Sequence, residues 1–204
     1  MAKLYFYYAS MNAGKSTNLL QADFNFRERG MATMLWTAAI DTRGGLSDAA
    51  AITSRIGLAA PAHGFAGDTD LFAAFARADA AAPLSCVLVD EAQFLAPAQV
   101  WQLARIVDEA GVPVLCYGLR TDFRGDLFPG SAALLGLADE LVELQAVCHC
   151  GAKATMNLRV DERGAAVRDG AQTEIGGNDR YLALCRRHFA EALDLHVAGP
   201  EPRT

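Results

Sequence analysis

Hydrophobic and polar positions fall into alternating blocks through the first two-thirds of the chain, and these blocks predict strands and helices in turn. Residues 4–8 are aromatic and β-prone, residues 31–37 form a second apolar run, and residues 112–117 form another. Residues 86–89 are short and wholly apolar, which is typical of a strand covered on both faces. Each of these four runs is expected to form a strand.

Two segments between these strands carry apolar residues at helical spacing. Residues 15–29 are predicted to form a helix that ends at Gly30 and turns Leu19, Leu20 and Phe24 inward. A second helix is expected to begin at Pro97 and end before Gly111, with an apolar stripe made of Val100, Leu103, Ala104 and Val107. The β-α-β-α order predicts an α/β fold, with a mostly parallel sheet flanked by helices on both faces.

The pattern changes near residue 143, where we expect a domain boundary. Beyond it, short β-like pieces, glycine pairs and Cys and His residues replace the long helices. We therefore expect an α/β domain over residues 1–143, a small module over 144–198 and a frayed tail over 199–204. The polar segment 41–54, with its Gly44-Gly45 pair, is expected to form a mobile surface loop.

Composition narrows the classes of function. The chain has 204 residues, of which 52% are hydrophobic and 21% charged, as in a folded globular protein. Its formal net charge of -6 disfavours binding to duplex DNA. No apolar run approaches the ~20 residues that cross a bilayer, and the first residues lack the apolar core of a signal peptide. We expect a cytoplasmic protein that binds neither nucleic acid nor membrane.

A phosphate-binding loop is indicated between the first strand and the first helix. The segment reads Ala9-Ser10-Met11-Asn12-Ala13-Gly14-Lys15-Ser16, and the P-loop pattern is G-x-x-x-x-G-K-[ST]. Ala9 stands where the first glycine belongs, which matters only if that position needs a positive φ. Backbone N–H groups at the helix start would face phosphates, Lys15 would reach the β- and γ-phosphates, and the Ser16 hydroxyl would bind Mg²⁺.

An acidic pair follows the buried strand at residues 86–89. An apolar strand that ends in Asp is typical of the second nucleotide-binding motif of P-loop proteins, in which the carboxylate holds the Mg²⁺ shell. Asp90 is that carboxylate here, and Glu91 next to it can take a proton from an acceptor hydroxyl. Two solvated carboxylates in a turn are the alternative, which the upstream P-loop disfavours.

Three of the five cysteines form a metal-binding pattern with a histidine. Cys148, Cys150, Cys185 and His188 make a C-x-C … C-x-x-H set, the form of a structural zinc site. Three thiolates and one imidazole close a tetrahedron and leave no position for water, so the Zn²⁺ would be structural. His149 is the alternative fourth ligand, ranked lower because it lies between two ligands in a tight turn. The other two cysteines, Cys86 and Cys116, are expected to be buried in strands.

Taken together and in this order, these motifs resemble the zinc-containing, P-loop type of the thymidine kinase family. The resemblance runs from about residue 4 to residue 189. It rests on M-N-A-G-K-S-T, V-L-V-D-E-A-Q-F, Y-G-L-R-T-D-F-R-G, C-H-C-G-A-K-A-T, I-G-G-N-D-R-Y and C-R-R-H. It implies a zinc-ribbon-like C-terminal module with a lasso-like loop, and transfer of the γ-phosphate of ATP to the 5′-hydroxyl of thymidine or deoxyuridine. It also implies a homotetramer with dTTP as feedback ligand, and leaves open whether ATP or GTP is the preferred donor.

The resemblance also implies roles for individual residues. Glu91 would be the catalytic base, Asp90 and Gln93 would act at ATP and Mg²⁺ with the P-loop, and Arg43 would help hold the transferring group. Residues near thymidine would be Met11, Asp41, Phe94, Leu119, Phe123, Gln172, Ile175, Gly176 and Tyr181. Asn157 stands where some relatives place Thr near the base, so it is not counted as a contact. Phe94, Phe123 and Tyr181 have the alternative of being core residues, and Arg43 of being a solvated loop residue.

Two other functions compete with this interpretation. The first is a P-loop ATPase whose zinc module binds nucleic acid. Residues 145–190 carry seven basic and five acidic side chains, a net of +2 that makes a mixed surface instead of a basic stripe. The second is a nucleotide sensor without catalysis, against which the presence of Lys15, Asp90 and Glu91 argues.

Overall fold

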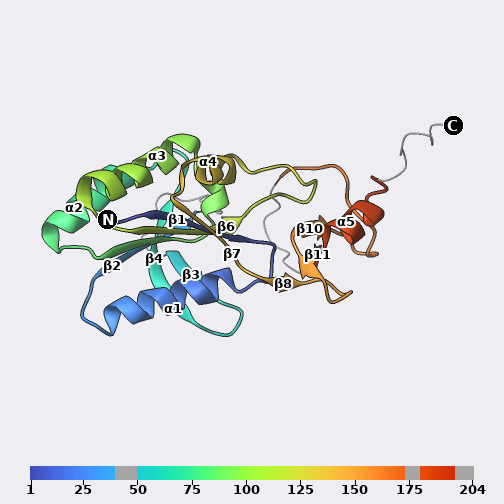
Figure 1. Ribbon diagram of the computed structural model, residues 1–204, viewed down its shortest axis with the longest axis horizontal. Helices are drawn as coiled ribbons and strands as arrows, with labels where there is room; N and C mark the ends of the chain where they lie inside the picture. The colour runs from blue at the N-terminus through green and yellow to red at the C-terminus, as the bar shows by residue number, and fades with distance from the viewer. Residues whose placement is uncertain (40–49, 173–179, 196–204) are drawn as a thin grey trace.

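A seven-stranded sheet between two layers of helices forms the body of the protein in the computed structural model (Figure 1), which describes residues 1–39, 50–172 and 180–195. The strands lie in the order β3-β4-β2-β5-β6-β1-β7, and every pair is parallel except β3 with β4. Their bounds are β1 Leu4–Ala9, β2 Thr33–Ala38, β3 Ala50–Thr53, β4 Ala59–Phe65, β5 Cys86–Val89, β6 Val114–Leu119 and β7 Glu140–Glu143. The expected α/β fold with a mostly parallel sheet is confirmed.

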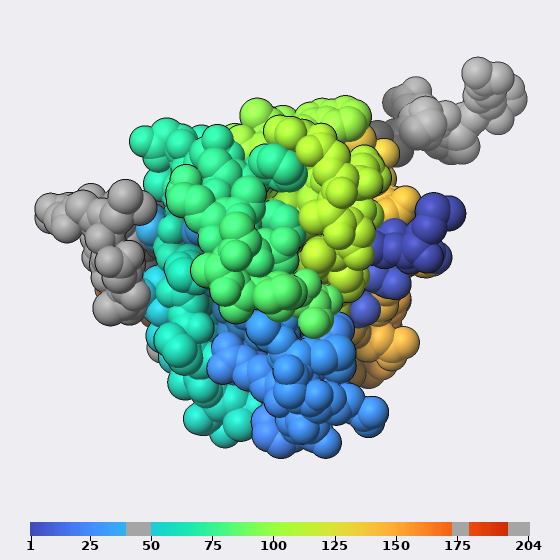
Figure 2. Space-filling model, turned by 90° about the vertical axis from the view of Figure 1, so that its left-hand side faces the viewer, coloured from blue at the N-terminus to red at the C-terminus, as the bar shows by residue number. Residues whose placement is uncertain are grey.

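Helices cover both faces of the sheet unequally. Helix α1 (Lys15–Arg27) lies on one face, and α2 (Leu71–Ala81), α3 (Pro97–Arg105) and α4 (Pro129–Leu137) lie on the other (Figure 1). Figure 2 views the end of the sheet away from the C-terminal ribbons, with the blue residues of α1 below and the green residues of α2 and α3 above. None of the helices that the structure describes is both long and apolar enough to cross a bilayer.

Strand β5 has both faces in the core, as its unbroken apolar run predicts. Val87 and Val89 pack into the cluster under α2, α3 and α4, whereas Cys86 and Leu88 pack into the cluster under α1, and all four are fully buried. Because neither face of β5 meets water, its first polar side chain can appear only where the strand ends, at Asp90.

Two local predictions were wrong. Phe24 is 58% exposed on α1, because the inward stripe of the helix runs through Leu19, Leu20 and Asp23. The Asp23 carboxylate is buried there and accepts a hydrogen bond from Arg27 Nε at 2.9 Å. Part of the segment expected to be a mobile loop, residues 50–53, forms β3, while its residues 41–49 lie outside the described ranges. The predicted start at Pro97 and end at Gly111 of the next helix are confirmed. After Arg105 this helix continues as a π-helical turn, η2 (Ile106–Ala110), and Gly111 ends it with φ 68°.

Two small antiparallel ribbons and a short helix follow the sheet. The ribbons pair β8 (Ala146–Val147) with β9 (Lys153–Ala154) and β10 (Met156–Arg159) with β11 (Tyr181–Leu184), and α5 (Arg186–Ala192) packs beside them. They share a small core of their own, centred on Leu158, Leu184 and Phe189. We call residues 146–172 and 180–192 the ribbon module.

Helix α4 approaches the backbone of a neighbouring element more closely than a side chain would allow. The contact is with the short 3-10 helix η1 (Ala92–Phe94) that follows β5. A Cβ at Gly130 would lie 2.6 Å from Leu95 O, 2.7 Å from Ala92 O and 2.8 Å from Gln93 O. Gly136, on the same helix, is exposed and would place its Cβ in open space.

These two glycines provide a matched test of the packing. We expect Gly130→Ala to lower the free energy of unfolding by about 1–3 kcal/mol, because the added methyl overpacks a contact made of backbone. We expect Gly136→Ala to raise it by about 0.5–1 kcal/mol, because alanine stabilises an exposed helix relative to glycine. Urea denaturation of both variants measures the difference, and equal effects would show that α4 can move away from η1.

Candidate functional site

A cavity of about 610 Å³ lies along the carboxyl ends of the parallel strands. Its lining includes most of the residues that the sequence indicated, namely Met11, Asn12, Gly14, Lys15, Ser16, Asp90, Glu91, Gln93, Phe94, Leu119, Phe123, Gln172 and Tyr181. Ala9, Ser10 and Ala13 are not part of that lining. Asp41, Arg43, Ile175 and Gly176 lie outside the described residues. The parallel sheet thus brings the loops after β1, β5 and β6 to one edge.

The loop after β1 has a backbone suited to phosphate. Gly14 at φ 76° caps α1, and Asn12 at φ 66° also adopts the left-handed conformation that Asn tolerates. Ala9 ends β1 as a buried residue and is not among those with positive φ. The position of the first motif glycine therefore needs no glycine in this chain.

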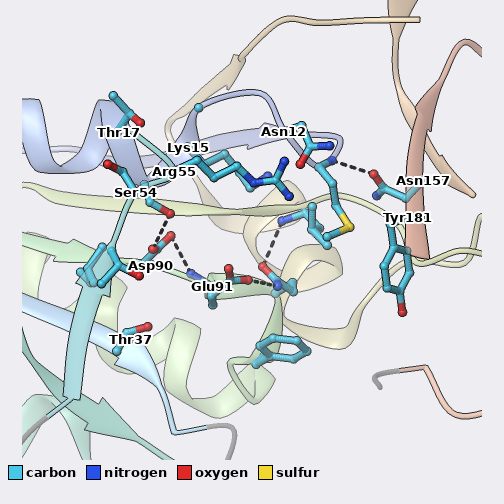
Figure 3. Close-up of a pocket in the computed structure, with 18 of the residues that line it drawn as sticks. Asn12, Lys15, Thr17, Thr37, Ser54, Arg55, Asp90, Glu91, Asn157 and Tyr181 are labelled. Carbon is cyan, nitrogen blue, oxygen red and sulfur yellow. Dashed lines mark hydrogen bonds between the residues drawn. The ribbon is translucent and has the colours of Figure 1, made fainter. Parts of the chain in front are cut away.

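Charged groups from the loop and from the end of β5 meet in the cavity (Figure 3). Lys15 Nζ donates to Ser10 O at 2.9 Å, and Ser16 Oγ donates to Asp90 Oδ2 at 2.8 Å. Burial lowers the pKa of Lys15, although Glu91 and Asp90 oppose that shift. Burial, and then the charge of Glu91, raise the pKa of Asp90 to about 6. A hydroxyl and a carboxylate oxygen so placed are the ligands that Mg²⁺ prefers beside a nucleotide.

Glu91 is held in a strained backbone and fixed through its side chain. Its φ and ψ are 53° and 37°, a left-handed conformation that is costly for a residue other than glycine and is common at functional sites. Gln93 Nε2 donates to Glu91 Oε2 at 2.5 Å, while Gln93 Oε1 accepts from Leu119 N at 3.0 Å. Because a backbone N–H can only donate, it fixes which end of the Gln93 amide faces Glu91. The carboxylate of Glu91 is therefore oriented by a group anchored on β6.

The ribbon module contributes the far wall of the cavity. Asn157, on β10, is 2% exposed and joins two loops: its Oδ1 accepts from Met11 N at 2.7 Å and its Nδ2 donates to Thr121 O at 3.1 Å. Ser10 Oγ donates to Ala154 O at 3.1 Å, which ties the phosphate-binding loop to β9 as well. Asn157, set aside by the sequence argument, is thus part of the site.

Phe123 lines the cavity beside this wall, and Arg159 packs on its ring. Phe123 is 1% exposed, and the Arg159 guanidinium carbon lies 3.9 Å from its ring centroid. Arg159 also donates to Asp169 O at 3.0 Å and to Ala171 O at 3.1 Å. Gln172, next along the chain, donates to Asp122 Oδ2 at 3.1 Å. The chain leading to residues 173–179 is therefore anchored at the cavity.

Sequence reasoning missed one whole wall of the cavity. This wall is made of residues 51–56, from β3 and the turn that follows. Four other residues that the sequence did not indicate also line the cavity: Thr17, Thr37, Asp122 and Phe128. Gly57, at φ 86°, marks a turn between two short β-prone stretches, and that local signal predicts a hairpin. The hairpin reaches the phosphate-binding loop because β3 packs against α1, where Ile52 joins the cluster of Leu19 and Leu20. No local pattern in the sequence reveals that contact.

The Cys and His pattern forms a compact cluster in the ribbon module. The ligand atoms of Cys148, Cys150, Cys185 and His188 all lie within 4.8 Å of one another. Sγ of Cys148 and Sγ of Cys185 each lie 3.4 Å from His188 Nδ1. Ligands on a tetrahedron with metal–sulfur bonds of ~2.3 Å would be roughly 3.5–3.8 Å apart, so the four residues fit one metal ion.

Two details favour this ligand set. His149 Nδ1 lies 3.9 Å from Cys148 Sγ, and its ring packs against that of His188 with centroids 4.3 Å apart, so it lies beside the cluster. Burial alone would raise the pKa of Cys148, but hydrogen bonds from the backbone at Cys150 and Cys185 and from His188 lower it to about 5. The thiolate that a metal requires is therefore favoured at neutral pH.

Comparison with known proteins gives a consistent family. The family model described as thymidine kinase matches residues 2–189. A thymidine kinase of Novosphingobium aromaticivorans is 76% identical over 95% of this chain and 99% of the relative, and one of Zymomonas mobilis is 62% identical over the same shares. One of Vibrio cholerae is 55% identical, again over 95% and 99%. A solved structure, Bacteroides Pif1 bound to ssDNA, aligns with 70% of this chain and 38% of its own length, at 15% identity and a TM-score of 0.35, too low to support any argument.

The metal cluster can be tested directly. We expect the purified, untagged protein to carry one metal ion per chain, with zinc as the metal that three thiolates and one imidazole select. Elemental analysis measures it, and Cys185→Ser should lose most of the metal, whereas Cys116→Ser, at a buried strand position, should keep it. Full metal content in Cys185→Ser would contradict the ligand set.

Proposed function

The chain belongs to the thymidine kinase family, and we propose that it transfers the γ-phosphate of ATP to the 5′-hydroxyl of thymidine or deoxyuridine. The observation that supports this most is the convergence of Lys15, Asp90 and Glu91 in one cavity. A phosphate-binding loop, a metal-binding carboxylate and a candidate base there satisfy the main requirements of phosphoryl transfer. ATP, with GTP as the untested alternative donor, would place its phosphates on residues 9–16.

Five polar residues of the cavity have a task in the proposed reaction. Glu91 takes the proton from the 5′-hydroxyl, and Gln93 keeps its carboxylate turned toward the acceptor. Lys15 leaves Ser10 O to bind the β- and γ-phosphates. Ser16 and Asp90 would hold Mg²⁺, which would supply positive charge beside the transferring group. Asp90 is buried and Lys15 is partly buried, so their charges act in surroundings of lower dielectric constant than water.

The zinc cluster is proposed to be structural. Its ligands join the turn between β8 and β9 to the start of α5, and the same module carries Asn157 and Tyr181 to the cavity. The metal would hold these elements together and take no part in the chemistry. Folding of the ribbon module is therefore expected to depend on the metal.

The acceptor pocket is proposed to lie between Met11, Leu119, Phe94, Phe123 and Tyr181, which leave room for a single ring. We propose that the backbone of residues 172–176 forms the hydrogen bonds to the edge of the pyrimidine. Asp41 would lie beside the sugar and Arg43 beside the transferring phosphate. The family resemblance supports those assignments. It also leads us to propose a cytoplasmic homotetramer inhibited by dTTP, which light scattering and inhibition assays would test.

The role of Glu91 gives the first test of the mechanism. We expect Glu91→Gln to lower kcat by about 10²–10⁴-fold, the usual cost of removing a general base, while ATP affinity stays near that of the wild type. Coupled kinase assays and titration with MgATP measure the two quantities. A kcat close to wild type would remove Glu91 from the reaction.

The identity of the acceptor gives the second test. A backbone carbonyl that accepts from thymine N3–H would meet no donor on cytosine, and a donor placed for O4 would face the cytosine amino group. We expect thymidine and deoxyuridine to be phosphorylated and deoxycytidine to be rejected by ~10⁴-fold in kcat/KM, as at sites built around buried hydrogen bonds. The assay runs across the natural deoxynucleosides. Comparable values for deoxycytidine and thymidine would overturn backbone reading and leave phosphoryl transfer standing.

A further inference from the structure

The hairpin between β3 and β4 carries a cation to the phosphate-binding loop. Its turn is well defined: Ser54 N donates to Leu58 O at 2.8 Å, Leu58 N donates back to Ser54 Oγ at 3.0 Å, and Gly57 N donates to Ser54 O at 3.1 Å. Arg55 lies in this turn and lines the cavity together with Lys15 and Asp90. Figure 3 shows the side chains of Lys15 and Arg55 next to one another.

A contribution to the stability of the fold does not explain why Arg55 lies beside Lys15. Within the part of the chain that the structure describes, Arg55 is exposed and forms no ion pair with a carboxylate. Its charge disfavours protonation of Lys15, adding to the effect of burial on the pKa of that lysine. Two like charges held near one another at a cavity wall are typical of a site that binds a polyanion.

Counting charges at the cavity also indicates a need for Arg55. Lys15 faces both Asp90 and Glu91, so the loop alone offers one cation against two carboxylates. A transferring phosphoryl group spreads negative charge over three oxygens, and P-loop enzymes commonly stabilise that charge with an arginine. A guanidinium also matches a phosphate with two parallel N–H groups, which a lysine cannot do.

We propose that Arg55 binds the γ-phosphate of the donor beside Lys15, and that the β3–β4 hairpin is the outer wall of the triphosphate site. The inference rests on the proposed function for the identity of the donor, a nucleoside triphosphate. It adds a phosphate-binding residue from within the chain, on an element separate from the phosphate-binding loop. Arg43, for which the family resemblance suggests a similar contact, lies outside the described residues and is a separate assignment.

Direct nucleotide titration tests the assignment without an acceptor. Calorimetric titration of the full-length protein with MgATP and with MgADP compares wild type, Arg55→Gln and Arg55→Lys. We expect Arg55→Gln to weaken MgATP binding by about 10- to 100-fold, the range for a charge-assisted hydrogen-bonded pair, and MgADP binding much less. Arg55→Lys should lose less MgATP affinity than Arg55→Gln, because lysine keeps the positive charge but lacks the two parallel N–H groups of the guanidinium. Arg77→Gln, at an exposed position on α2, is the matched control and should bind both nucleotides like wild type.

The outcomes separate this inference from the proposed function. Equal losses of MgATP and MgADP affinity would overturn the assignment to the γ-phosphate, and unchanged affinities in Arg55→Gln would overturn the contact itself. Arg55 is exposed in a turn, so the variant should fold, and thermal unfolding at the wild-type temperature confirms that. If wild type binds MgATP but phosphorylates no thymidine, the proposed acceptor fails while the nucleotide affinities still decide the role of Arg55.

Discussion

A parallel sheet buried on both faces leaves its carboxyl edge as the place where polar side chains can collect, and the candidate site depends on that constraint. The faces of β5 are fully apolar, so Asp90 and Glu91 follow the last buried residue, Val89. β6 lies between β5 and β1, which sets the distance between the acidic pair and the phosphate-binding loop. The Leu119 N–H at the end of β6 then orients Gln93 toward Glu91. Residues from three strands therefore act together because their strands end at one edge.

The ribbon module is joined to this edge by hydrogen bonds as well as by packing. Ser10 and Met11 both bond to it, through Ala154 and Asn157. Asn157 also donates to Thr121 O, so one buried amide links the loop after β1 to the loop after β6. A buried N–H that loses its partner destabilises a protein by about 1–3 kcal/mol, and the loop geometry thus depends on a correctly folded module. The Cys and His cluster belongs to the same module, in the turn between β8 and β9 and at the start of α5.

Local sequence signals predicted what depends on local chemistry. Gly14, Lys15 and Ser16 after a strand, Asp90 after an apolar run, and paired Cys and His residues each have a physical cause within a few positions. Phe24 failed because helical spacing does not reveal which stripe of α1 the sheet covers; Asp23 lies in that stripe and Phe24 beside it. Arg55 and Asn157 were missed for a related reason. Their contacts cross from one element to another. The packing of β3 on α1 and the position of the ribbon module create those contacts, and no single window of sequence shows either.

The extended conformation of Ala9 has a consequence for how such proteins are found in genomes. A strict search for G-x-x-x-x-G-K-[ST] would pass over this chain, although its loop, helix cap and lysine are all present. What the first position of the pattern requires here is a small residue that can be buried at the end of a strand, 4% exposed in this case, and an alanine meets that requirement. A motif that allows any small residue at the first position would therefore find P-loop proteins that a motif requiring glycine there does not find.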